Sequence, residues 1–370
     1  MSRARVLLAG FYPPPYAGEP IHVKQLAHLL RGQGLQVDIL NLNRHAPPSS
    51  EYLGARSPFE LVRLLYTAPE PRSVLHLHTN GHSWRSWAMI TAAAMAGRFR
   101  GVTGLLTLHS GLLPGYVNLF RAPRRMFAGW VLRSFARVIA VNDEIAAAVS
   151  SLTADTSRVR VIPAFLGITT VPGLSPEDRA AIRDLKPLIV AVAGGEEDPE
   201  HGLSVVVRAL PRLIERFPGV GAVLIGWQTG PKTNALIAEL GLGKHARCLG
   251  EVSHERCLSL LRAADVVVRS TFLDGDAITV REALALGVPV VASDTGLRPR
   301  GVVLFRKGEI GDLVAQLTGV LKDQAPSLVG PGTPDHSAEE LWQTYAELID
   351  QDGVRACSSR VGGGTGESGS

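Results

Sequence analysis

The apolar positions of the chain form short continuous runs, and these alternate with longer stretches in which apolar residues recur every three or four positions. The first run, 6–11, leads into glycine and proline, and the next stretch, 22–32, carries Val23, Leu26 and Leu30 on one helical face. A continuous run is typical of a strand buried on both faces, and the longer spacing is typical of an amphipathic helix. Strands that alternate with helices predict an α/β fold with a doubly wound parallel sheet.

The alternation occurs in two series, which predicts two Rossmann-like domains of similar size. Further strands of the first series are expected at 37–42, 74–78, 104–109 and 138–141, and those of the second at 188–195, 222–226, 246–250, 266–269 and 288–292. We therefore expect a first domain at 1–170, an interdomain linker at 171–187 and a second domain at 188–325.

The C-terminal part of the sequence predicts one more helix and then a tail. Ser337 and Glu340 form a capping box in front of a helical pattern, so we expect a helix at 337–351. Residues 353–370 are rich in glycine and serine, and we expect them to form a disordered tail.

The composition is that of a soluble globular protein. The 370 residues are 45% hydrophobic and 19% charged, which excludes collagen-like, disordered and polytopic membrane chains. Three cysteines without a CxxC pair favour a reducing compartment. The apolar run before Gly10 is too short for a signal peptide, and the longest such run, 87–97, is about half a membrane span. We therefore expect a cytoplasmic protein.

The net charge of +4 conceals an uneven distribution. Residues 1–170 hold 18 basic and 8 acidic side chains, whereas the remaining residues hold 20 and 26. Halves of opposite charge indicate two domains with different partners.

The segment 269–294 carries the most informative chemistry. A strand that ends at Arg269 is followed by a glycine-containing loop and by a helix that begins near Ile278 or Thr279. Loop amides and a helix N-terminus bind phosphate oxygens. Asp274 and Glu282 lie on the loop and in the helix, where their carboxylates can accept hydrogen bonds from sugar hydroxyls.

This segment resembles the Glu-x7-Glu signature of glycosyltransferase family 4, although Asp-Gly-Asp stands in place of the family's Glu-Gly-Phe, which suggests a divergent subgroup. Other parts of the chain are also similar to the family. They are the glycine loop and helix from Tyr16, Thr107-Leu-His109-Ser110-Gly111, Val138-Ile-Ala-Val, Val161-Ile-Pro163, Leu224-Ile-Gly226, Leu249-Gly250, Ala263-Ala-Asp265-Val, and the final helix with Trp342 and Tyr345.

The resemblance implies the GT-B fold, in which two doubly wound Rossmann-like domains face each other across a cleft and a C-terminal helix crosses back to the first domain. It also implies a glycosyltransferase that moves a sugar, with retention, from a UDP- or GDP-sugar to a saccharide or polyprenyl-linked acceptor during polysaccharide or glycoconjugate biosynthesis. The first domain would bind the acceptor and the second the donor. No cofactor is required on this view; Mg²⁺ or Mn²⁺ is compatible with it but not expected, and no metal ligands are assigned.

The resemblance also implies roles for individual residues. Glu282 would bind the donor ribose, Asp274 would face the hydroxyls of the donor sugar, and His109 would lie near the transferred sugar. Near the diphosphate we expect the backbone of Ala277, Ile278 and Thr279 together with Gly18, Glu19 and Gly194. Trp227 would lie against the nucleotide base or a neighbouring helix.

One departure from the family concerns the diphosphate clamp. Gly195 or Glu196 stands where the family has an arginine, and His201 stands where it has a lysine, within a strongly acidic segment. Acidic side chains repel a diphosphate. A substitute cation would have to come from the first domain, from a metal, or from Arg281, Arg298, Arg300, Arg306 or Lys307.

Two patterns allow a metal interpretation that we do not favour. Asp274-Gly-Asp276 matches the metal motif of a different glycosyltransferase fold, but it lies in the second Rossmann-like repeat. His76 and His78 alternate along one strand, close to His82 in sequence, and we expect them to form hydrogen bonds in the core or to line a cleft.

The segment 115–138 predicts a helix in which arginines alternate with aromatic residues. It either contacts an anionic membrane, at the cytoplasmic face where a lipid-linked acceptor lies, or packs its aromatics inside as an ordinary surface helix. No nucleic-acid module is visible.

Two alternatives to a transferase stay open. One is a weakened GT-B protein that acts as a binding or partner subunit, favoured by the missing diphosphate clamp. The other is a sugar-nucleotide epimerase of similar fold.

Overall fold

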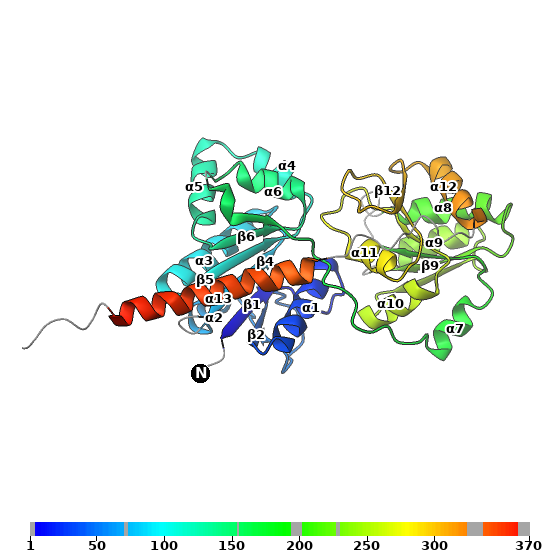
Figure 1. Ribbon diagram of the computed structural model, residues 1–370. Helices are drawn as coiled ribbons and strands as arrows, with labels where there is room; N and C mark the ends of the chain where they lie inside the picture. The colour runs from blue at the N-terminus through cyan, green and yellow to red at the C-terminus, as the bar shows by residue number, and fades with distance from the viewer. Residues whose placement is uncertain are drawn as a thin grey trace, which may run out of the picture. The chain divides into compact units, whose positions relative to one another are not determined.

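The computed structural model describes residues 4–69, 73–153, 155–193, 202–226, 230–323 and 336–361, with backbone alone at 351–361. The chain divides into two compact units, each built around its own parallel sheet (Figure 1). Unit 1 comprises Met1–Tyr12, Val23–Pro163 and His336–Ser370, and unit 2 comprises Pro13–His22 and Ala164–Asp335.

The sheet of unit 1 has seven parallel strands in the order β3-β2-β1-β4-β5-β6-β7. The strands are β1 (Arg5–Gly10), β2 (Gln36–Asn41), β3 (Leu53–Gly54), β4 (Val74–Thr79), β5 (Thr103–Leu108), β6 (Arg137–Ala140) and β7 (Val159–Val161). Because β2 and β4 lie on opposite sides of β1, the direction of winding reverses between β1 and β4, where the carboxyl ends of the strands open a crevice.

Eight helices accompany this sheet in the described part of the chain. They are α1 (Gly18–Gly32, whose first turn clusters with unit 2), α2 (Pro58–Thr67), α3 (Trp84–Arg100), α4 (Leu113–Asn118), α5 (Ala122–Leu132), α6 (Asp143–Ser150), the 3₁₀ helix η1 (Thr156–Arg158) and α13 (Ser337–Val361). The single helix predicted at 115–138 is wrong. Pro123 lies in the first turn of α5 and separates it from α4, and β6 begins at Arg137.

The sheet of unit 2 has six parallel strands in the order β10-β9-β8-β11-β12-β13. The strands are β8 (Leu188–Val192), β9 (Gly221–Ile225), β10 (Ala246–Gly250), β11 (Val266–Arg269), β12 (Val290–Ser293) and β13 (Val302–Phe305). The helices are α7 (Pro176–Ile182), α8 (Leu203–Ile214), α9 (Pro231–Glu239), α10 (His254–Ala263), α11 (Ile278–Ala285) and α12 (Ile310–Asp323). Alternate residues of β8 and β11 enter two separate apolar clusters, so both faces of the sheet are buried.

The segment predicted as a linker, 171–187, contains helix α7. Ser175 caps this helix through its hydroxyl, and Pro176 occupies the first helical position. Asp178, whose side chain is 2% exposed, forms two-pronged hydrogen bonds with Arg256 of α10. The segment is therefore packed onto unit 2.

Helix α13 belongs to unit 1 and covers its sheet (Figure 1). Leu341, Tyr345 and Leu348 lie on one face of the helix and are at most 1% exposed. The Tyr345 hydroxyl hydrogen bonds to Nδ1 of His76 at 2.6 Å, and Glu347 pairs with Arg160 of β7 at 2.7 Å.

Helix α13 also runs past its predicted end at 351, to Val361. One glycine in a helix interior costs only about 1 kcal/mol, so Gly353 does not stop it. The remainder of the predicted tail, 362–370, lies outside the described residues.

The α/β class predicted from the two strand–helix series is confirmed by both sheets. No helix among the residues that the structure describes is both long and apolar enough to cross a membrane.

Candidate functional site

The loop between β11 and α11 presents the residues that the sequence singles out in unit 2. Strand β11 ends at Arg269, and α11 begins at Ile278 after Ala277, whose side chain gives no capping hydrogen bond. No N-cap side chain therefore accepts a hydrogen bond from the first backbone N–H groups of α11. These groups lie at the carboxyl edge of the sheet, where parallel α/β sheets bind ligands.

Asp274 is held by two arginines. Arg269 donates to both of its carboxylate oxygens, at 2.8 and 3.1 Å, and Arg298 donates to Oδ2 at 2.6 Å. The hydroxyl of Thr271 also donates to Oδ2. Both carboxylate oxygens are therefore engaged within unit 2.

The charge state of Asp274 follows from these partners. Burial by itself raises the pKa of this carboxyl, but the charges and hydrogen bonds of Arg269 and Arg298 outweigh burial, and the pKa lies well below its ordinary value. The side chains of Asp274 and Arg298 are only 12% and 3% exposed. Asp274 is thus a buried, ionised group.

The second carboxylate of the Asp-Gly-Asp segment is also paired. Asp276 accepts a hydrogen bond from Nε of Arg281 at 2.6 Å and one from the backbone N–H of Ala164 at 2.9 Å. Because arginines neutralise both carboxylates, the segment lacks the open pair of negative charges that a divalent cation requires.

Glu282 is buried, with 1% of its surface exposed, in the second turn of α11. Its Oε1 lies 2.5 Å from Nε2 of His254, which begins α10. The charge of Glu282 adds to burial in raising the pKa of the neighbouring Cys257 thiol, which therefore stays protonated.

The start of α1 belongs to the same unit. A Cβ atom placed on Gly18 would lie 4.0 Å from Cδ1 of Ile278, so the backbone at Gly18 approaches the start of α11 closely. Glu19 follows it and is 8% exposed. The structure thus places Gly18 beside Ile278, at the start of α11.

His22 is a neutral residue in the first turns of α1. Burial lowers its pKa from 6.5 to about 4, against the opposing effect of a hydrogen bond with the Ala164 carbonyl. The Nδ1–O distance is 2.6 Å, so Nδ1 carries the proton and donates.

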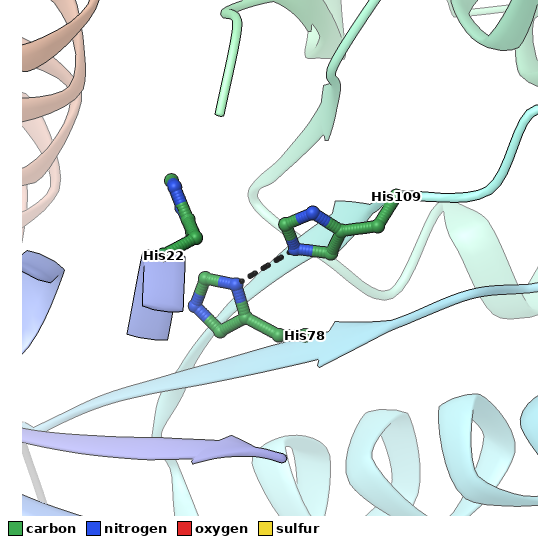
Figure 2. Close-up of side chains that lie close together, drawn as sticks. All are labelled: His22, His78 and His109. Carbon is green, nitrogen blue, oxygen red and sulfur yellow. Dashed lines mark hydrogen bonds between the residues drawn. The ribbon is translucent and has the colours of Figure 1, made fainter. Parts of the chain in front are cut away.

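His109 lies in unit 1, directly after β5. Its Nε2 is 3.2 Å from Nδ1 of His78 on β4, and the two rings stack with centroids 5.5 Å apart (Figure 2, which also draws His22). His76 of the same strand is a core residue, because Tyr345 and Thr107 engage both of its ring nitrogens. The ring of His76 thus forms the core hydrogen bonds that the sequence suggests for it.

Three expected donor-binding residues, Gly194, His201 and Trp227, lie outside the described residues, as does the acidic segment around Glu196. Three of the candidate substitute cations have acidic partners: Arg281 pairs with Asp276, Arg298 with Asp274, and Arg306 with Asp312 at 3.3 Å.

Sequence reasoning missed the groups that hold the acidic residues, namely Arg269, Thr271 and His254. His254 stands at the start of an amphipathic pattern directly after Ser253, the N-cap of α10. This position in the sequence predicts the start of a helix, but it does not indicate that the His254 side chain contacts Glu282.

Comparisons with known proteins agree with this architecture. The family model described as "Glycosyltransferase Family 4" matches residues 17–166, and the one described as "Glycosyl transferases group 1" matches residues 177–325. Together they span most of both units. The chain belongs to glycosyltransferase family 4.

Curated relatives include a phosphatidyl-myo-inositol mannosyltransferase of Mycobacterium leprae, 28% identical over 80% of this chain and 79% of that protein. A D-inositol 3-phosphate glycosyltransferase of Corynebacterium efficiens is 30% identical over 60% of this chain and 50% of that protein. The chain spans about half the length of the first curated relatives that it matches.

Solved structures with the same fold include sucrose-phosphate synthase from Thermosynechococcus elongatus, with a TM-score of 0.68 and 20% identity over 94% of this chain and all of that one. HepE from Anabaena, in complex with UDP and glucose, has a TM-score of 0.67 and 17% identity over 96% of this chain and all of that one. These likenesses and the two parallel sheets define the GT-B fold.

Proposed function

We propose that this chain transfers a glycosyl group from a nucleotide-sugar donor to an acceptor hydroxyl. The observation that carries the proposal is the buried Glu282 carboxylate, held by His254 beside the uncapped start of α11. Membership of glycosyltransferase family 4 and the UDP-glucose complex of HepE support the same class of donor.

The donor would bind at the carboxyl edge of the unit 2 sheet. Glu282 accepts hydrogen bonds from the ribose hydroxyls, and the backbone of Ala277, Ile278 and Thr279 binds the diphosphate. A helix N-terminus stabilises a phosphate through its free N–H groups and its dipole. Gly18 allows the backbone at the start of α1 to approach the same position.

Asp274 takes a different role from the one that the family resemblance implies. Since both of its oxygens already bind Arg269, Arg298 and Thr271, we assign to it the positioning of the loop in front of α11. The donor sugar hydroxyls are then met by the loop backbone.

The reaction breaks the bond between the anomeric carbon and the diphosphate oxygen. The acceptor hydroxyl oxygen forms the new bond to the anomeric carbon, and its proton passes to the departing diphosphate oxygen. The nucleoside diphosphate departs with the bonding electron pair. The N–H groups of α11 stabilise the developing charge on the leaving group, so catalysis rests on positioning and electrostatics. We propose retention of configuration and no metal requirement.

The acceptor side of the proposal includes contact with an anionic membrane through α5. Met126, Phe127 and Trp130 lie on one face of this helix and are 74%, 50% and 46% exposed. Arg121 and Arg133, at its two ends, are exposed as well. Exposed aromatic residues flanked by arginines suit the cytoplasmic leaflet, and a cytoplasmic location remains part of the proposal.

Sedimentation with vesicles tests the membrane contact. Wild type should bind vesicles that contain anionic phosphatidylserine and not those of phosphatidylcholine alone, and the double variant Met126→Ser/Trp130→Ser should lose binding. Equal binding by the variant would contradict the contact.

Release of nucleoside diphosphate from a panel of UDP- and GDP-sugars, with and without acceptor extract, tests the function itself. Release that depends on acceptor supports a transferase. Nucleotide binding without release would favour the binding-subunit alternative, and an isomerised donor formed without acceptor would favour an epimerase.

A further inference from the structure

We propose that a pocket in unit 1, between α2, α3 and the ends of β1 and β4, binds the alkyl-phosphate portion of a lipid-phosphate acceptor. The pocket opens where the winding of the sheet reverses, since Phe11 directly follows β1 and Thr79 ends β4. Ligands of doubly wound sheets bind at that crevice. The role of the bound molecule as an acceptor rests on the proposed function, but its binding to the pocket does not.

The pocket has the size and lining of a site for an apolar chain. Its volume is about 670 Å³, within the range of small-molecule sites. Leu42, Leu61, Met89 and Ala92 are among the side chains that line it. Apolar surface of this kind gains free energy when an alkyl chain displaces water from it.

The mouth of the pocket exposes further apolar surface. Trp84 is 67% exposed and Val62 is 41% exposed, and both line the pocket. Exposed apolar side chains gathered beside a cavity are a common mark of a binding site.

Cationic side chains at the same pocket indicate which polar group the ligand carries. Arg44 and Arg85 line it and are exposed, and neither pairs with an acidic side chain among the residues that the structure describes. Trp84 begins α3, so the positive end of the dipole of a 17-residue helix faces the same place. An anionic group is therefore favoured there.

His82 adds a neutral hydrogen-bonding group to the lining. Its Nδ1 is buried and has no hydrogen-bond partner, and burial lowers its pKa below the ordinary value. A ligand hydroxyl or phosphate oxygen would satisfy this nitrogen.

An alkyl chain joined to a phosphate matches both parts of the pocket. A free sugar would leave the apolar lining without a partner, and a neutral alcohol would leave Arg44 and Arg85 without an anion. The expected occupant is thus an amphiphile whose chain enters the pocket and whose phosphate meets the two arginines.

Isothermal titration calorimetry of the full chain tests the proposal with hexyl, octyl and decyl phosphate below their micelle concentrations. The affinity should rise by about two- to fourfold for each CH₂ group until the pocket is filled. Octanol and inorganic phosphate should each bind at least about tenfold more weakly than octyl phosphate, since each satisfies only one part of the site.

Variants separate the two parts. Arg44→Gln/Arg85→Gln should weaken octyl phosphate binding about tenfold and leave octanol binding unchanged, because each exposed charge pair contributes up to about fivefold in affinity. Arg98→Gln, exposed on the same helix, is the matched control and should have no effect. Ala92→Trp should fill the pocket and abolish octyl phosphate binding. If Ala92→Trp does not fold, Ala88→Trp, which changes another residue of the lining, serves as the second variant.

The proposal is overturned if affinity does not depend on chain length, or if a folded Ala92→Trp or Ala88→Trp variant binds octyl phosphate as wild type does. Because no turnover is needed, the outcome is independent of the transferase assay. If the protein turns over a nucleotide sugar but does not bind octyl phosphate, the assignment of this pocket is contradicted and the proposed function stands. If the protein binds octyl phosphate but turns over no nucleotide sugar, the proposed function is contradicted and the pocket assignment stands.

Discussion

Nε2 of His254 lies 2.5 Å from Oε1 of Glu282, so a side chain from α10 holds a buried carboxylate on α11. The two residues are 28 positions apart in the sequence and belong to consecutive helices of unit 2. The contact fixes the direction of the carboxylate, and His254 is therefore a positioning residue for the group that we assign to ribose binding.

We expect His254→Ala to destabilise unit 2 by about 1–3 kcal/mol, because it leaves a buried carboxylate without its hydrogen-bond partner. Urea denaturation measures the change. The double variant with Glu282→Ala, which removes the carboxylate altogether, should show a coupling energy between the two sites of about 0.5–3 kcal/mol. Strictly additive effects would show that the contact carries no energy.

Asp274→Asn should destabilise the protein by about 3–5 kcal/mol at neutral pH, because it leaves Arg269 and Arg298 buried without their counter-charge. Asp184→Asn is the matched control, since Asp184 and its partner Arg183 are 77% and 78% exposed. The control should change stability by less than about 1 kcal/mol.

The pH dependence of the same variant follows from the direction of the shift. The folded pKa of Asp274 lies below the ordinary value of 3.8, so its contribution is fully present above that value and is lost as the pH falls toward the folded pKa. The stability difference between wild type and Asp274→Asn should be constant from about pH 5 to 8 and shrink below about pH 4. A difference that grows on acidification would contradict the ionised assignment.

Arg256→Ala should loosen α7, because Asp178 is buried and relies on the guanidinium for its charge partner. The hydrogen bonds from Arg256 hold the pKa of Asp178 below its ordinary value, despite burial. We expect faster proteolytic cleavage within 171–187 and partial recovery in Arg256→Lys, which cannot form the two-pronged contact. Arg208→Ala, an exposed residue of α8, should cleave as wild type does.

The fold could be predicted from the sequence because its signals are local. Continuous apolar runs predicted ten of the thirteen strands in the described part of the chain and missed the short strands β3, β7 and β13. Ser337 with Glu340 predicted the start of α13. The break between α4 and α5 was equally local, since Pro123 marks a helix start, but the run of arginines and aromatic residues suggested one continuous helix.

The site was only partly predictable, because its acidic residues are held by distant partners. The spacing of the loop and α11 indicated Asp274 and Glu282, whereas Arg298 reaches Asp274 from the loop that follows another strand. The pocket beside Trp84 and Arg85 arises from α2, α3 and the ends of three strands, β1, β2 and β4, and no single segment of the sequence contains its pattern.

The most direct test of the central claim is the kcat/KM for nucleotide-sugar turnover in Glu282→Gln. This variant keeps the shape of the side chain and an oxygen that can accept from His254, but it removes the charge offered to the ribose hydroxyls. Loss of such charged hydrogen bonds predicts a decrease of about 10- to 100-fold. Glu239→Gln, exposed at the end of α9, should match wild type. Undiminished turnover in a folded Glu282→Gln variant would contradict the assignment of the donor site.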